Sequence, residues 1–293
     1  MEKNSIKQLL LSLNIITEDT IQVYYPFVRD RDDVSVLKCS KSNVIFLSRT
    51  DHVDLSYYEA KVNFRLGQDV NRDAAVRLGL DDAQRRAEQL KCIVSNKKWL
   101  DVGTGVGGIL DILKPIAREI IAVEIQENIR KELLQLGYRV FPKIENIEDD
   151  GIEVVSLFHV FEHLSNPIDA LKLIKSKMKK GGKVVIEVPH ARDFLFDFLD
   201  CESFKRFTFW SEHLILHTRN SLEIFLSEAG FSNIEILGLQ RYPLSNHLYW
   251  LKHGVPGGHN HWNFLNSFDL NSAYETKLVS LDRTDTLLAI ASS

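Results

Sequence analysis

The chain is poor in cysteine, with only 3 in 293 residues: Cys39, Cys92 and Cys201. They lie far apart and form no C-x-x-C pair, so a cysteine zinc site or a disulfide framework is not indicated. Such scarcity fits a reducing cytoplasm, and we expect a cytoplasmic protein. Basic residues are not in excess either, because 36 Lys and Arg face 40 Asp and Glu, a net charge of −4. We therefore expect no nucleic-acid partner.

Long hydrophobic runs are also missing. The longest apolar stretch near the start, residues 9–16, contains two polar residues and is too short to cross a bilayer. It has no small-residue cleavage site, so we predict an amphipathic helix and no membrane span. The hydrophobic content of 44% and charged content of 26% are typical of a globular protein with a sizeable core.

The most informative stretch, residues 99–110, combines a strand end, a glycine turn and a helix start. Asp101 closes the strand, Gly103 and Gly105 permit a tight turn, and the helix N-terminus attracts electron-rich groups. The spacing fits the dinucleotide pattern G-x-G-x-x-G, yet a structural turn or an S-adenosylmethionine site fits as well. The next strand ends in Glu124, a position from which a carboxylate reaches ribose hydroxyls. Asp101 favours the methyl donor, since its carboxylate suits a cationic amino group better than a pyrophosphate.

Strands and helices alternate through the rest of the chain, which predicts a parallel α/β sheet. The expected strands are residues 98–102, 120–124, 138–141, 154–158, 184–189, 234–238 and 286–290. The expected helices are residues 108–117, 128–136, 166–178 and 221–229. We expect residues 1–95 to form an N-terminal cap or substrate region and residues 96–293 the cofactor domain. Residues 240–284 are too long for a plain loop and predict an inserted, substrate-facing lobe.

The N-terminal region has signals of its own. Residues 34–39 and 43–48 are typical of two paired strands with a polar turn between them. Helices are expected to begin at Tyr57-Tyr58 and to span residues 74–94. The second helix carries several arginines, which form either a solvated face or a contact with an anionic substrate. These arginines are Arg77, Arg85 and Arg86.

With these pieces in order, the sequence resembles the class I S-adenosylmethionine-dependent methyltransferases. The matching segments are residues 100–108 (LDVGTGVGG), 123–124 (VE), 158–167 (FHVFEHLSNP), 181–190 (GGKVVIEVPH), and 211–231, which begins Ser-Glu-His-Leu and ends Ala-Gly-Phe. The resemblance implies a Rossmann-like, seven-stranded, mostly parallel sheet with an antiparallel last strand. It also implies S-adenosylmethionine as cofactor. Within the class, the group that acts on sugars of capsule, O-antigen and other surface polysaccharides is the most similar, so the resemblance implies a carbohydrate-type small molecule as acceptor.

The resemblance also implies where the cofactor binds. Glu145-Asn146 follows the third strand, where relatives bind adenine, and Gln126 lies close to the same place. His159 follows a buried strand at the carboxyl edge of the sheet, where ligands bind in this fold. The expected cofactor-binding residues are Asp101, Gly103, Thr104, Gly105, Glu124, Ile125, Glu145, Asn146 and His159.

A sugar hydroxyl is a poor nucleophile near neutral pH, so a base is expected beside it. His213 is the expected base, because a histidine titrates near the working pH, and Glu212 is expected to orient it or the acceptor. His163, His190 and Arg192 are the expected substrate-binding residues. For each of these side chains, hydrogen bonding within a loop is the alternative interpretation.

No metal is expected. His159-Val-Phe-Glu-His163 fits the H-x-x-E-H zinc pattern, but that pattern needs a helix, and a strand runs directly into His159. Sugar C-methyltransferases of the similar group carry a cysteine zinc site near the N-terminus, and here only Cys39 occupies that stretch. This departure argues against a zinc-bearing cap and against C-methylation, which is therefore the first alternative and not the main prediction. An NAD-dependent oxidoreductase and a non-catalytic cofactor-fold protein are further alternatives, and the sequence leaves the oligomeric state open.

Overall fold

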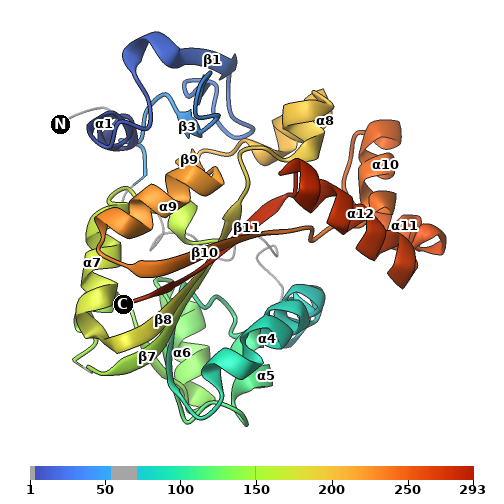
Figure 1. Ribbon diagram of the computed structural model, residues 1–293. Helices are drawn as coiled ribbons and strands as arrows, with labels where there is room; N and C mark the ends of the chain where they lie inside the picture. The colour runs from blue at the N-terminus through green and yellow to red at the C-terminus, as the bar shows by residue number, and fades with distance from the viewer. Residues whose placement is uncertain (1–3, 54–70, 149) are drawn as a thin grey trace.

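The computed structural model describes residues 4–53, 71–148 and 150–293, and its centre is a seven-stranded sheet (Figure 1). The strand order is β10-β11-β8-β7-β4-β5-β6. The strands are β4 (Lys98–Val102), β5 (Glu119–Val123), β6 (Arg139–Phe141), β7 (Ile152–Phe158), β8 (Met178–Pro189), β10 (Ser232–Leu239) and β11 (Thr286–Ser292). Strand β11 is antiparallel to both of its neighbours, whereas the pairs from β8 to β6 are parallel. The predicted fold class is confirmed.

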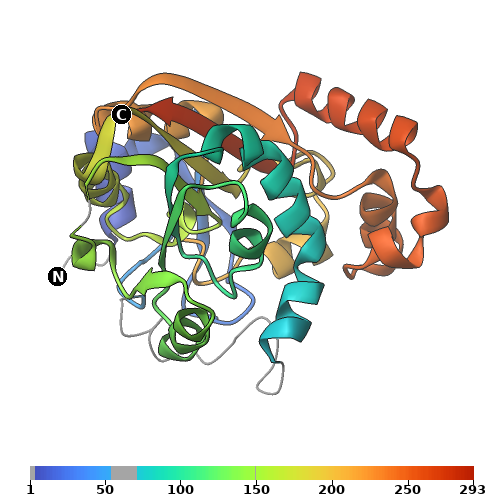
Figure 2. The same ribbon diagram turned by 90° about the horizontal axis from the view of Figure 1, so that it is seen from below.

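Helices cover both faces of this sheet, because apolar strands need a partner on each side. The helices are α3 (Arg72–Leu78), α4 (Leu80–Val94), α5 (Gly108–Leu113), α6 (Glu127–Gln135), α7 (Pro167–Lys177) and α9 (Arg219–Glu228). On one face, Leu90, Leu110 and Leu133 belong to one core cluster. On the other, Leu171 and Phe225 of α7 and α9 belong to a second. Figures 1 and 2 show α4 and α5 side by side, away from α7.

A second sheet lies beside the first and has the order β1-β2-β3-β9. Its strands are β1 (Ile21–Tyr25), β2 (Val36–Cys39), β3 (Ile45–Leu47) and β9 (Ile215–Leu216), preceded by α1 (Ser5–Ser12) and the short 3-10 helix η1 (Glu18–Thr20). The predicted pairing of the two N-terminal strands is confirmed. Strand β9 comes from a distant part of the sequence and pairs with β3. It therefore ties the segment that carries His213 to the N-terminal region.

A helical lobe separates β10 from β11, where an insertion was predicted. It contains α10 (Leu244–His253), α11 (Gly258–His261), the 3-10 helix η5 (Asn263–Leu265) and α12 (Phe268–Leu281). The lobe extends to one side of the sheet in Figures 1 and 2. Two further elements, the π-helix η4 (Phe194–Phe198) and α8 (Glu202–Thr208), follow β8. Within the described residues, the structure contains no helix that combines the length and apolarity of a membrane span.

Several predicted element boundaries are wrong. Residues 74–94 are two helices, because Gly79 ends α3 and begins α4 with non-helical backbone angles. Helix α5 ends at Leu113, before the predicted end, and β8 begins at Met178, before the two glycines that were expected to precede it. Helix α1 begins earlier than the predicted N-terminal helix. The helix expected at Tyr57-Tyr58 lies outside the described residues.

Candidate functional site

The glycine loop after β4 has the geometry that its sequence predicts. Gly103 and Gly105 have φ angles of +73° and +55°, a region that other residues adopt only with strain. A Cβ on Gly103 would lie 2.4 Å from the Val160 side chain, so only glycine fits there. Beside Gly105, no atom of the described residues lies within 4 Å of such a Cβ. The loop is thus packed on one side and leaves room for a ligand on the other.

Glu124 fixes the far side of this loop. Its carboxylate accepts hydrogen bonds from the backbone amides of Gly105 and Gln126, both at 2.8 Å. It is 5% exposed, and burial raises the pKa of Glu124 while these amide bonds oppose the rise. The side-chain oxygen Oε1 of Gln126 is buried without a hydrogen-bond partner among the described residues. An acceptor of this kind fits a ligand that brings a donor, such as an adenine amino group or a ribose hydroxyl.

Asp101 lies at the end of a buried hydrogen-bond chain. The indole of Trp99 donates to the Ser156 hydroxyl at 2.7 Å, and that hydroxyl donates to the Asp101 carboxylate at 2.6 Å. Burial raises the pKa of Asp101 to about 6, although the Ser156 hydrogen bond acts against the rise. A neighbouring cation would stabilise the ionised carboxylate, as the proposed role toward an amino group requires. Sequence reasoning missed Trp99 and Ser156, because their pairing depends on the register of β4 and β7.

The other predicted cofactor residues differ in their contacts and in their exposure. The backbone amide of Thr104 donates to the Val123 carbonyl oxygen, which holds the loop against β5. The carbonyl oxygen of Ile125 accepts a hydrogen bond from Arg130. Glu145 and Asn146 are exposed in the 3-10 helix η2 (Ile144–Asn146), which follows β6. These residues lie around one end of β4, β5 and β6, and their contacts with a cofactor stay a prediction.

A buried ion cluster involves the arginines of α4. Glu187 on β8 is fully buried and accepts bonds from Arg85 at 2.8 and 3.0 Å and from Arg86 at 2.7 and 2.9 Å. The interpretation of the predicted arginines as a solvated helix face is therefore wrong for Arg85 and Arg86, whereas Arg77, on α3, is exposed as that interpretation expects. Burial raises the pKa of Glu187, but its cationic and hydrogen-bonding neighbours lower it well below its usual range. Residues on α4 and β8 that are distant in sequence thus form one charged unit, which pattern reading cannot predict.

His159 connects this cluster to the lobe. It has a φ of +54° and follows β7 directly. Nε2 of His159 lies 2.7 Å from Arg241 and 3.3 Å from Oε1 of Glu187 in the ion cluster. Nδ1 donates to Glu162 Oε1 at 3.0 Å. Arg241 also pairs with Asp82 of α4. The contacts of His159 are with protein side chains, and its predicted contact with the cofactor stays a prediction.

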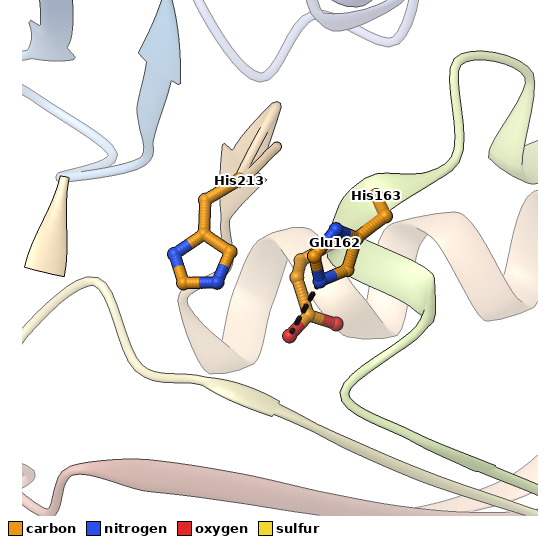
Figure 3. A group of neighbouring side chains, drawn as sticks. All are labelled: Glu162, His163 and His213. Carbon is orange, nitrogen blue, oxygen red and sulfur yellow. Dashed lines mark ion pairs between the residues drawn. The ribbon is translucent and has the colours of Figure 1, made fainter. Parts of the chain in front are cut away.

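Figure 3 shows Glu162, His163 and His213, which converge from two separate segments. Glu162 and His163 are in the 3-10 helix η3 (Phe161–His163), and His213 precedes β9. One donor atom from each of the three lies within 4.8 Å of the other two. His163 lies between two carboxylates, with Nε2 3.8 Å from Glu162 and Nδ1 3.8 Å from Glu212. The structure thus brings together His213, Glu212 and His163 from the sequence prediction and adds Glu162.

Glu162 is the acid at the centre of this group. It is fully buried, and its Oε2 has no hydrogen-bond partner among the described residues. Burial raises the pKa of Glu162, but the His159 hydrogen bond and the nearby charges of His163 and His213 outweigh this effect and lower it to about 2. The group is therefore a buried carboxylate ion, which needs a positive partner to be stable.

The backbone fixes the tautomer of His213. Its Nδ1 lies 3.2 Å from the carbonyl oxygen of Thr208, which can only accept, so Nδ1 carries the proton. When the ring is neutral, its lone pair is therefore on Nε2. Asp30 holds the same segment by accepting bonds from the amide and hydroxyl of Ser211, at 3.0 and 2.6 Å. No pattern in the sequence signals the role of Asp30, because that role depends on how the N-terminal region packs.

The remaining predicted substrate residues lie against the end of the lobe. His190 is fully buried, and its Nδ1 donates to the Thr284 carbonyl oxygen at 3.0 Å. Burial lowers the pKa of His190 to about 4, despite the opposing charge of Asp282. Arg192 pairs with Asp282 at 2.6 Å. These contacts attach the lobe to the end of β8, and substrate binding by the two residues stays a prediction.

The comparisons with known proteins agree with this geometry. The sequence model of the methyltransferase domain family matches residues 72–236, more than half of the chain. The chain belongs to this family. The ubiquinone biosynthesis O-methyltransferase of Acinetobacter baylyi is 23% identical over 177 residues, which cover 55% of this chain and 74% of the relative.

One solved structure that shares the fold comes from Haloferax volcanii. The Haloferax volcanii methyltransferase complex with the Trm112 methyltransferase activator has a TM-score of 0.51 and 13% identity, covering 75% of this chain and 92% of that one. A SAM-dependent methyltransferase from Archaeoglobus fulgidus has a TM-score of 0.48 and 20% identity, over 76% and 95%. The methyltransferase has the class I fold, and S-adenosylmethionine is the cofactor of that fold. The sugar subgroup stays a prediction.

Proposed function

We propose that this methyltransferase transfers a methyl group from S-adenosylmethionine to a hydroxyl of a sugar or sugar nucleotide, in the synthesis of a surface polysaccharide. The observation that carries the proposal is the 3.2 Å contact of His213 Nδ1 with the Thr208 carbonyl oxygen, in a ring that lies beside the buried Glu162 at the carboxyl edge of the sheet. The carbohydrate class is supported by the resemblance of residues 211–231 to sugar methyltransferases.

Bound S-adenosylmethionine supplies an electrophilic methyl group on sulfur. The chain has to hold this cofactor and exclude other orientations of it. We assign that task to the Gly103–Gly105 turn, to Glu124 at the ribose, and to Asp101 at the amino group. The buried acceptor of Gln126 and the open side of Gly105 fit a ligand of this size and polarity.

The acceptor hydroxyl has to lose a proton as its oxygen bonds to the methyl carbon and the carbon–sulfur bond breaks. His213 is the proposed base, with Nε2 as the proton acceptor. The Thr208 carbonyl presents this nitrogen by holding the proton on Nδ1. Glu212, which is 3.8 Å from His163, is proposed to position the acceptor together with His163 and the more distant His190 and Arg192. Alignment of acceptor and methyl supplies much of the rate enhancement in such transfers.

A phenolic hydroxyl is the second candidate acceptor, favoured by the similarity to the ubiquinone biosynthesis O-methyltransferase. The two candidates differ in their need for a base. A phenol ionises near pH 10, as tyrosine does, so it depends less on a base than a sugar hydroxyl. Replacement of His213 should therefore slow sugar methylation much more than phenol methylation.

Calorimetry with S-adenosylhomocysteine is the first test. Absence of binding at millimolar ligand would rule out the proposed function. Methyl transfer is then measured on a panel of sugar nucleotides and dihydroxyphenols. With the true sugar acceptor, His213→Ala should lower kcat by about 10²–10⁴-fold and leave the dissociation constant of S-adenosylhomocysteine unchanged. His253→Ala, on the exposed end of α10, is the matched control and should keep full activity.

A further inference from the structure

The group of Glu162, His163 and His213 has the composition of a metal centre. Zinc binds histidine nitrogens and carboxylate oxygens at about 2.0–2.2 Å, so two ligands of one tetrahedral ion lie roughly 3.4 Å apart. Here the three donor atoms lie within 4.8 Å of one another, and the His163–Glu162 distance is 3.8 Å. Small rotations of the side chains would therefore close the group around an ion.

Two of the three residues present a donor atom in a suitable state for a metal. Glu162 has a buried carboxylate oxygen that no described residue contacts through a hydrogen bond. His213 is protonated on Nδ1 by its bond to Thr208, which leaves Nε2 free of a proton for a metal. A histidine ligand commonly donates its other N–H to a carbonyl or carboxylate in this way, which fixes the ring.

The backbone holds the two segments at a fixed separation. The amide of Leu214 donates to the carbonyl oxygen of Glu162 at 3.0 Å. Leu214 is followed directly by β9, which pairs with β3 in the second sheet. The rings of His163 and His213 are edge to face, with centroids 5.2 Å apart. The donor set is thus largely preformed, which reduces the entropic cost of binding an ion.

We propose that Glu162, His163 and His213 form a binding site for one divalent transition-metal ion, of which Zn²⁺ or Mn²⁺ are the best candidates. Two imidazoles and one carboxylate leave at least one coordination position open for water or for an oxygen of the acceptor. This is not the zinc-peptidase use of H-x-x-E-H. His159 contacts Glu162 through Nδ1 and Arg241 through Nε2, so it orients a ligand and does not bind the ion itself.

This inference bears on the proposed function but does not depend on it. A His213 that binds an ion has no lone pair left for a proton. The ion would then acidify the acceptor hydroxyl in place of the base, and the proton would leave to bulk water. Metal binding can be measured without cofactor or acceptor, so the two proposals can fail separately.

The test uses the full chain, treated with a chelator and dialysed. Titration with ZnCl₂ and with MnCl₂ is followed by calorimetry, and Co²⁺ is added separately because its visible spectrum reports the coordination geometry. We expect one ion per chain for Zn²⁺ or Mn²⁺. His213→Ala and Glu162→Gln should each weaken binding by at least about ten-fold, since even changes to outer partners of metal ligands cost that much. His253→Ala should bind as the unmodified protein does.

Two results would overturn the inference. One is that neither Zn²⁺ nor Mn²⁺ shows saturable binding to the unmodified protein at millimolar concentration. The other is binding that stays unchanged in both ligand variants, which would place the ion elsewhere. S-adenosylhomocysteine binding by each variant checks that it is folded. If metal binds but S-adenosylhomocysteine does not, the proposed function fails and the metal site stands.

Discussion

The backbone amide of Leu214 donates to the carbonyl oxygen of Glu162 at 3.0 Å, and this bond joins the two segments that carry the candidate catalytic residues. One segment follows β7 of the large sheet, and the other enters β9 of the small sheet. The candidate site therefore lies at the junction of the two sheets. Its geometry depends on the N-terminal region as well as on the methyltransferase fold.

Glu124 should be essential for cofactor binding. Glu124→Ala removes the acceptor for the amides of Gly105 and Gln126 together with the proposed ribose contact. Hydrogen bonds to charged groups contribute about 1.5–3 kcal/mol, so the affinity for S-adenosylhomocysteine should fall by at least about ten-fold in calorimetry. Glu127→Ala, in an exposed pair with Lys131, is the matched control and should bind normally. Equal affinities of the two variants would remove the ribose assignment.

Asp101 should make cofactor binding pH-dependent. The pKa of Asp101 is raised to about 6, so in the free protein the carboxyl group is protonated at lower pH. The protonated carboxyl group favours the folded state, and this contribution to the free energy of unfolding is lost as the pH rises through 6. The cationic amino group of the ligand favours the ionised form. The affinity for S-adenosylhomocysteine should therefore fall by up to about ten-fold per pH unit below pH 6. Calorimetry in buffers of different ionisation enthalpy should detect proton release.

Asp101→Asn is the control for this pH effect. The amide cannot ionise, so its weaker binding should be independent of pH over the same range. A pH dependence that persists in Asp101→Asn would assign the titration to another group and would count against contact between Asp101 and the amino group.

Gly103→Ala should destabilise the protein through a steric clash. The new Cβ would lie 2.4 Å from Val160, and the φ of +73° adds backbone strain. The two effects together should lower the free energy of unfolding, measured by urea denaturation, by about 2–4 kcal/mol. Gly105→Ala carries only the strain and should cost about 1–2 kcal/mol. Val160→Ala should recover part of the stability in the Gly103→Ala background, and no recovery would show that the clash is not the cause.

His247 should weaken the protein in acid. It is buried between Tyr274 and Gln240, at 2.7 and 3.2 Å, and burial lowers the pKa of His247 from 6.5 to about 4. The unfolded chain thus takes up the proton first, so stability is complete above pH 6.5 and is lost as the pH falls toward 4. Between about pH 6.5 and pH 5, the unmodified protein should lose about 2 kcal/mol more than His247→Gln. Equal losses in the two proteins would contradict this prediction.

The fold could be predicted largely because its signals are local. Strand β4, the Gly103 and Gly105 turn and the acid at Glu124 depend on neighbouring residues and on a regular alternation of strands and helices. The ends of helices and strands were less predictable. The spacing of apolar residues in residues 74–94 indicates one continuous helix, but Gly79 divides the segment into α3 and α4. Strand β9 has only 2 residues, and its pairing with β3 leaves no pattern in the sequence.

The sequence by itself determined the class of the protein, its cofactor loop and the residue types available for chemistry. The tertiary structure decided which of these meet. Arg85 and Arg86 of α4 pair with Glu187 of β8, a contact between residues about 100 positions apart in the sequence. Glu162 meets His213 only because two sheets share a boundary there. Spacing along the chain defines local geometry, whereas contacts between distant segments follow from the packing of the whole chain.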